Sequence, residues 1–278
     1  MNSWFRVFAG LFLFSVLWGC LNVETTVRIK PDGSGTLEQR VLMNPQVSQL
    51  MNQGTGSNKD RPLDLLDEEK LKRDAEKMGT GVRLVSAERV TADEGNGYRA
   101  LYAFDDVNTL KIRQNPDEPP LSGSGLSNSD AEEKPFPEKI TFSFRKGTPS
   151  SLTIRLPKPQ EKQQTQEKEK SAEKPSPKPE NPEEALKDAE MVKSLFHGMR
   201  MVFTVEIQGT VLTTNATYRE GSRITLMEMD FDKLTSDIDQ FRNLVKANPH
   251  KPGEIGDLLR TFPGIKAELQ ETVTVEFQ

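Results

Sequence analysis

Alternation between apolar and polar residues along short stretches limits the fold of this chain more than any other feature. Such alternation is typical of strands with one buried and one solvated face. It is clearest over residues 199–208, where Met201, Phe203, Val205 and Ile207 fall on one side of the predicted strand. The other predicted strands cover residues 23–30, 36–43, 82–90, 98–104, 140–144, 152–156, 211–213, 222–229 and 269–277.

Turn residues join these strands into hairpins. Residues 31–35, Pro-Asp-Gly-Ser-Gly, separate the first two strands, because proline presets φ and glycine accepts positive φ. The Glu-Gly-Asn-Gly sequence at 94–97 and the Lys-Gly-Thr-Pro sequence at 146–149 predict a second and a third hairpin. Gly209 predicts a bend, after which 211–213 continues the strand 199–208, and 222–229 pairs back across a further turn at 219–221.

Helix signals fall between the hairpins. Asn44-Pro45 and Asn181-Pro182 each combine an asparagine cap with proline at the first helical position, and the second helix is predicted to run to about Gly198. Further helices are predicted at about 65–78 with Asp67 as cap, after the cap Asp232 with the stripe Leu234, Ile238, Phe241 and Val245, and near 255–259. Since regular βαβ alternation is absent, we expect an α+β fold, in which antiparallel sheets built from hairpins have helices packed on one side.

Composition divides the chain. Residues 158–181 consist almost entirely of Lys, Glu, Gln, Ser and Pro, and such a segment buries too little apolar surface to offset its ordering entropy. We therefore expect a disordered charged insert between an N-terminal region, 20–157, and a C-terminal α+β region, 182–278. The insert either separates two domains or leaves from a single one. Residues 113–138, rich in Pro, Gly and Ser, are predicted to be a loop.

The N-terminus predicts export and lipid anchoring. Residues 7–17 form an apolar run too short for a bilayer, which needs about 20 apolar residues, but of the length of a signal-peptide core. Leu17-Trp18-Gly19-Cys20 resembles the lipobox of bacterial lipoproteins, although small residues are usual at the position of Trp18. The resemblance implies that residues 1–19 are a removed signal peptide and that Cys20, the only cysteine, carries acyl chains such as palmitate.

The residue after the cysteine bears on location. In two-membrane bacteria resembling the enteric ones, aspartate at this position retains lipoproteins in the inner membrane. The chain has Leu21 there. We therefore expect it on the periplasmic face of the outer membrane, with its soluble part in the periplasm.

The net charge and the sequence motifs argue against several functional classes. The formal charge is −5, which argues against nucleic acid as a partner. Neither His197 nor His250 lies in a zinc motif, and the G-x-S-x-G sequence of many hydrolases is absent. An acidic run, Asp230, Asp232, Asp237 and Asp239, suits helix capping better than a calcium loop. We therefore expect a protein that is not an enzyme, with no catalytic residues, no bound metal and no cofactor.

Methionines gather in the C-terminal region. Methionine side chains are flexible and suit adaptable apolar surfaces. Most would belong to an ordinary core, but together they could line an apolar groove for acyl chains. The candidate groove residues are Met191, Met199, Met201, Met227 and Met229.

Two segments resemble the LppM-like group of bacterial lipoproteins, long described as a domain of unknown function. The first is Val27–Gly35, and the second is Gly209–Ala216 followed by Gly221–Leu226. The chain departs from the group at Ala216, where glycine is common, at Met227-Glu228, where tryptophan is frequent, and in the insert 158–181. The resemblance implies an envelope lipoprotein with an α+β domain, and some members look like lipid or glycolipid binders.

Two functions follow as hypotheses. One is a membrane-anchored, non-enzymatic envelope lipoprotein that binds a partner protein or supports envelope assembly. The alternative is a module that binds or transfers lipid or glycolipid in an apolar groove.

Overall fold

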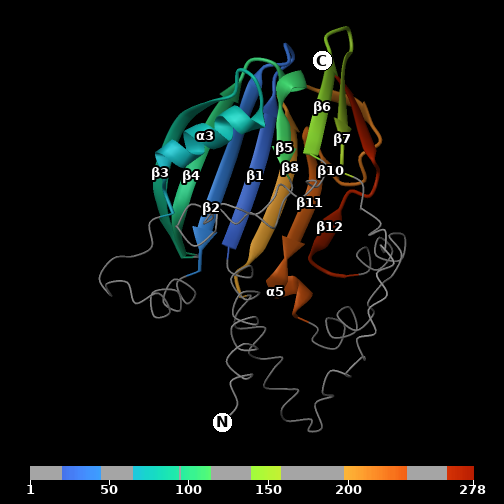
Figure 1. Cartoon of the computed structure of the whole chain (residues 1–278). Helices are drawn as coiled ribbons and strands as arrows, with labels where there is room; N and C mark the ends of the chain where they lie inside the picture. The colour runs from blue at the N-terminus through green and yellow to red at the C-terminus, as the bar shows by residue number, and fades with distance from the viewer. Residues whose placement is uncertain (1–20, 45–64, 94, 114–138, 158–196, 237–261) are drawn as a thin grey trace, which may run out of the picture.

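Two β-sheets form the described part of the molecule (Figure 1). The structure, a computed structural model, describes residues 21–44, 65–93, 95–113, 139–157, 197–236 and 262–278. The first sheet, sheet A, has eight strands, and the second, sheet B, has five.

Sheet A is built around the first strand after residue 20. Its path is β10-β11-β8-β1-β2-β4-β3, and β12 pairs with β11 beside this path. The strands are β1 (Leu21–Ile29), β2 (Gly35–Met43), β3 (Arg83–Ala92), β4 (Gly95–Phe104), β8 (Arg200–Ile207), β10 (Arg219–Glu220), β11 (Arg223–Asp230) and β12 (Ile265–Ala267). Because β1 has a partner on each side, it is a central strand.

Sheet B has the order β5-β6-β7-β13-β9, and all its neighbours are antiparallel. Its strands are β5 (Lys111–Arg113), β6 (Lys139–Arg145), β7 (Ser150–Arg155), β9 (Val211–Thr214) and β13 (Thr272–Phe277). Strands from before and after residues 158–196 therefore contribute to both sheets. The described parts of the two regions share their hydrogen-bond ladders rather than lying side by side.

The three hairpins predicted from turn chemistry are present: β1 pairs with β2, β3 with β4 and β6 with β7. Gly33 in the first turn has φ +88°, a conformation that glycine adopts without strain. Strand β11 pairs back antiparallel, and its partner is β8. By contrast, β9 does not continue β8 in sheet A, but pairs with β13 in sheet B.

One pairing departs from an all-antiparallel arrangement. Strands β1 and β8 run parallel, with Val23 opposite Met201 and Ile29 opposite Ile207. Parallel neighbours need a long crossover connection, and here most of the chain lies between the two strands. Hairpin signals are local, so they give no indication of this long-range contact.

Helices are few in the described residues. They are α3 (Glu68–Met78), the 3₁₀ turn η1 (Val107–Thr109) and the single turn α5 (Phe231–Leu234). Asp67 caps α3 as predicted, because its carboxylate accepts a hydrogen bond from the Lys70 backbone N–H at 2.9 Å.

The main core lies between sheet A on one side and α3 with sheet B on the other. One face of sheet A supplies Val27, Leu37, Tyr102 and Val205, together with other buried side chains. Leu71 and Ala75 reach this core from α3, and sheet B adds a set of buried residues: Ile140, Phe142, Leu152, Ile154, Val273, Val275 and Phe277. We call this face of sheet A the inner face and the opposite one the outer face.

The expected α+β class is wrong. The described residues are mostly strand, and the inner face of sheet A is covered largely by a second sheet rather than by helices. Period-two patterns within sheet B indicated strands but not which sheet they join. The helices predicted after Asn44 and Asn181, most of that after Asp232 and that near 255–259 lie outside the described residues, as do the predicted loop and insert.

Candidate functional site

The predicted groove methionines come together only in part. Met201 on β8 lies opposite Met229 on β11 and, on its other side, opposite Val23 of β1. Met227 lies two positions from Met229 and therefore on the same face. Met191 and Cys20 lie outside the described residues.

The described methionines differ in how far they are buried. Met199 is buried, and Met227 is half-buried and packs against the main core. Met201 and Met229 are half-buried at the end of the sheet where β8 begins and β11 ends. The structure thus brings Met201, Met227 and Met229 onto one face as a small apolar stretch, part of which belongs to the core.

The outer face of sheet A carries a pattern that the sequence analysis missed. A first row of alternating charges crosses five strands, each charge paired with the next: Glu88 (β3), Arg99 (β4), Glu38 (β2), Arg28 (β1) and Glu206 (β8). The nitrogen–oxygen distances along the row are 3.3, 3.5, 2.8 and 3.2 Å. We call this set the first charge row.

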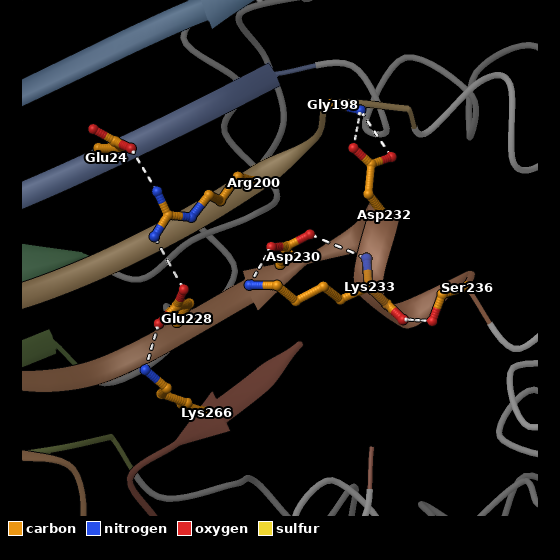
Figure 2. Close-up of polar contacts among 9 residues, drawn as sticks. All are labelled: Glu24, Gly198, Arg200, Glu228, Asp230, Asp232, Lys233, Ser236 and Lys266. Carbon is orange, nitrogen blue, oxygen red and sulfur yellow. Dashed lines mark hydrogen bonds and ion pairs between the residues drawn. The ribbon is translucent and has the colours of Figure 1, made fainter. Parts of the chain in front are cut away.

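A second charge row crosses the same face nearer the start of β1. It runs through Arg40 (β2), Glu24 (β1), Arg200 (β8), Glu228 (β11) and Lys266 (β12). Figure 2 shows Arg200 placed between the carboxylates of Glu24 and Glu228, at 3.2 and 3.0 Å. Lys266 contacts the second oxygen of Glu228 at 3.0 Å, so this carboxylate is held from two sides (Figure 2).

The electrostatics of Glu228 follow from this placement. Burial acts to raise the pKa of its carboxyl, but hydrogen bonds from Arg200 and Lys266 outweigh burial and keep the pKa below its ordinary value. The carboxylate is thus charged at neutral pH and locked in place. Between the rows, Thr26 and Thr204 share a hydrogen bond between their hydroxyls at 3.1 Å.

Acidic residues at the end of β11 organise the next turn. Asp230, rather than the predicted Asp232, caps α5 by accepting from the Lys233 backbone N–H at 3.1 Å, and it also pairs with the Lys233 ammonium (Figure 2). Burial acts to raise the pKa of Asp230, but these bonds to Lys233 keep it lowered. Asp232 instead accepts from the Gly198 N–H and lies 3.0 Å from His197 Nδ1.

These contacts bear on the acidic run considered from the sequence. Asp230 and Asp232 both use their oxygens for protein partners, while Asp237 and Asp239 lie outside the described residues. Within the described ranges, no group of three or more His, Cys, Asp or Glu side chains is placed to hold a metal ion. The same part of the chain contains no helix long and apolar enough to cross a bilayer.

Both rows consist of guanidinium, ammonium and carboxylate groups that neutralise one another. The sequence contained a signal for them, because the polar positions of the alternating strands carry Glu24, Arg28, Glu38 and Arg40 with opposite signs. That signal becomes readable only once the strand order and register are known.

Comparison with known proteins gives little further identification. No family model matches the chain, and no curated protein matches it. Among solved structures, the NMR structure of the folded domain of the Mycobacterium tuberculosis LppM protein is similar, with 14% identity, 93% of this chain and 90% of that chain covered, and a TM-score of 0.32. This neighbour belongs to the group that the sequence resembles.

Proposed function

We propose that this chain is a lipid-anchored protein of the bacterial cell envelope, whose β-rich domain binds a partner protein or supports envelope assembly without catalysing a reaction. The observation that carries the proposal is the position of β1. This strand begins at Leu21, directly after Cys20, and is hydrogen-bonded to β2 and β8. An anchor on Cys20 would hold the largest sheet by one of its central strands.

The outer face of sheet A supports the partner-binding part of the proposal. Neither α3 nor sheet B covers it, because both join the core on the inner face. Its charges are already paired, so a partner need not neutralise them, and the order of signs would favour one docking register over others.

The anchor is tested by Cys20→Ser. We expect this variant to lose labelling with a fatty-acid probe and to leave the membrane fraction, whereas the parent chain shows both. Continued labelling and continued membrane association of Cys20→Ser would overturn the anchor.

The partner is tested by photo-crosslinking in living cells. A crosslinking amino acid at Thr36, half-buried on the outer face of β2, is compared with one at Arg145, which is exposed on sheet B. We expect a discrete crosslinked protein from Thr36 that the Arg145 control does not give. Equal products from both positions, or none from Thr36, would contradict binding at this face.

The destination is a further part of this proposal. Leu21 carries no inner-membrane retention signal, so we propose the periplasmic leaflet of the outer membrane in a two-membrane host. On a density gradient the parent chain should travel with outer-membrane markers, and Leu21→Asp should move it to the inner membrane. Recovery of the parent chain with inner-membrane markers would refute this placement.

Lipid or glycolipid binding is the second candidate, and the shared face of Met201, Met227 and Met229 favours it. Flexible thioether side chains adapt to acyl chains of varied shape. Mass spectrometry of residues 21–278 purified without the anchor tests it. A lipid retained by the parent protein and lost from Met201→Gln combined with Met229→Gln would support this function, and no retained lipid would count against it.

A further inference from the structure

Strand β1 begins at the residue after Cys20, which restricts how the domain is oriented relative to the membrane. Consecutive Cα atoms are about 3.8 Å apart, so the first residue of a central strand lies within that distance of the proposed acylated residue. A tether this short does not allow the domain to tumble away from the bilayer, whereas a flexible linker would.

The residues brought to the membrane are those that lie at the level of Leu21 in sheet A or one position from it. Across the strands, Leu21 lies opposite Met43, and Met43 lies opposite Asn96. On the other side, Arg200 of β8 lies opposite Asp230 of β11 in the strand register, and α5 follows. We call these five residues the anchor end of sheet A. In Figure 1 this end of the sheet is marked by the arrowhead of β2 and by α5, toward the bottom.

We propose that the anchor end rests on the lipid headgroups, with the strands of sheet A directed away from the membrane. This inference rests on the proposed anchor at Cys20. The opposite end, at the turn between Ile29 and Gly35, then faces away from the bilayer. Eight residue steps separate Leu21 from Ile29, which corresponds to about 26 Å at about 3.3 Å per residue.

The tether rather than charge selects this end. Arg200 is paired with Glu24 and Glu228, and Lys233 is paired with Asp230. These cations are therefore neutralised within the protein and have little to gain from anionic headgroups. The orientation should be the same on neutral and on anionic vesicles.

The chain offers a clean labelling experiment. Cys20 is the only cysteine, so once it is acylated an introduced cysteine is the only reactive thiol. A spin label is placed at Asn96→Cys in the anchor end or, as the matched control, at Lys30→Cys at the opposite end. Both positions are exposed. The full-length acylated variants are reconstituted in vesicles that contain a nickel-chelating headgroup lipid.

We expect collisional relaxation by nickel to be several-fold stronger at Asn96→Cys than at Lys30→Cys, on neutral and anionic vesicles alike. Equal relaxation, or stronger relaxation at Lys30→Cys, would overturn the proposal. Insertion of about 20 Gly/Ser residues between Cys20 and Leu21 adds about 25 Å of mean reach and should reduce the contrast to less than half. An unchanged contrast would show that the tether does not impose the orientation.

Failure of the anchor itself would look different. If Cys20 were not acylated, its free thiol in the parent chain would react with the spin label. The parent chain would also not float with the vesicles. That result refutes the proposed function, whereas acylated, floating protein without the Asn96–Lys30 contrast refutes only the orientation.

Discussion

At the scale of single residues, the Tyr102 hydroxyl is a buried polar group without a hydrogen-bond partner among the described residues. Tyr102 is fully buried on β4, and Asn22 Oδ1 likewise lacks a partner within the described ranges. A buried polar group without a partner costs about 1–3 kcal/mol of desolvation. The ring, in contrast, belongs to the main core, which also contains Leu71 and Ala75 of α3.

Tyr102→Phe should therefore leave the free energy of unfolding unchanged or raise it by about 1 kcal/mol. Tyr102→Ala is the control for the ring and should cost about 3–5 kcal/mol, the usual range for removing a buried aromatic side chain. Both values come from urea denaturation. A loss above about 1 kcal/mol in Tyr102→Phe would mean that a buried partner, such as a water molecule, satisfies the hydroxyl.

The two buried tyrosines also predict a response to alkaline pH. Burial is the main cause that raises the pKa of both Tyr98 and Tyr102. The unfolded chain loses these protons near pH 10 while the folded chain keeps them, so their contribution is complete below about pH 10 and falls as the pH rises further. Stability measured from pH 8 to 11 should drop more steeply in the parent than in Tyr98→Phe combined with Tyr102→Phe. Parallel slopes would contradict this assignment.

At the scale of elements, the two charge rows differ in burial along their length. The Glu228 side chain is 13% exposed and held by two cations, whereas the Glu88 side chain is 61% exposed and pairs only with Arg99 among the described residues. Exposed pairs usually contribute about 0–1 kcal/mol, because water screens them. Charged hydrogen bonds shielded from water contribute about 1.5–3 kcal/mol.

Glu228→Gln should therefore destabilise the protein by about 1.5–3 kcal/mol at neutral pH, and the matched Glu88→Gln by less than about 0.5 kcal/mol. The pKa of Glu228 is lowered, so its contribution is present above the unfolded value near 4.3 and is lost as the pH falls through the folded value. The gap between the two variants should narrow as the pH falls below about 4.3 and continue to narrow through the folded value. Equal losses at neutral pH would show that the second row adds no more than an exposed pair.

Local elements were predictable from the sequence because their signals are local. The turn at Asp32–Ser34, the cap at Asp67 and the strand β8 each depend on a few neighbouring residues, and the structure contains all three. Burial along β8 does not follow the predicted alternation, because Val202 and Thr204 are buried as well. The parallel contact of β1 with β8, the pairing of β13 with β7 and the charge rows depend on register between distant segments. No local pattern encodes that register, so the second sheet and the outer face could not be derived.

At the scale of the whole molecule, strands from both sides of residues 158–181 hold each sheet together. β8 pairs with β1 in sheet A, and β13 pairs with β7 in sheet B. Each half of the chain alone would therefore expose central strand edges and buried apolar side chains. The two regions should behave as one cooperative unit.

Separate expression of residues 20–157 and 182–278 should give chains without a cooperative unfolding transition, as measured by circular dichroism on Cys20→Ser versions. The control is deletion of 158–181, which should change the melting temperature by only a few degrees, because loop-closure entropy varies slowly with length. A cooperative transition in either half would show independent domains. Loss of cooperativity after the deletion would show that the insert packs.

The central claim is that Cys20 becomes the lipidated first residue, one peptide bond before β1. The most direct measurement is mass spectrometry of the N-terminal peptide from membrane-extracted protein. We expect a peptide that begins at Cys20, with diacylglycerol on its thiol and an acyl chain on its amine. A peptide that retains residues 1–19, or one that begins elsewhere and contains a free Cys20 thiol, would contradict the account.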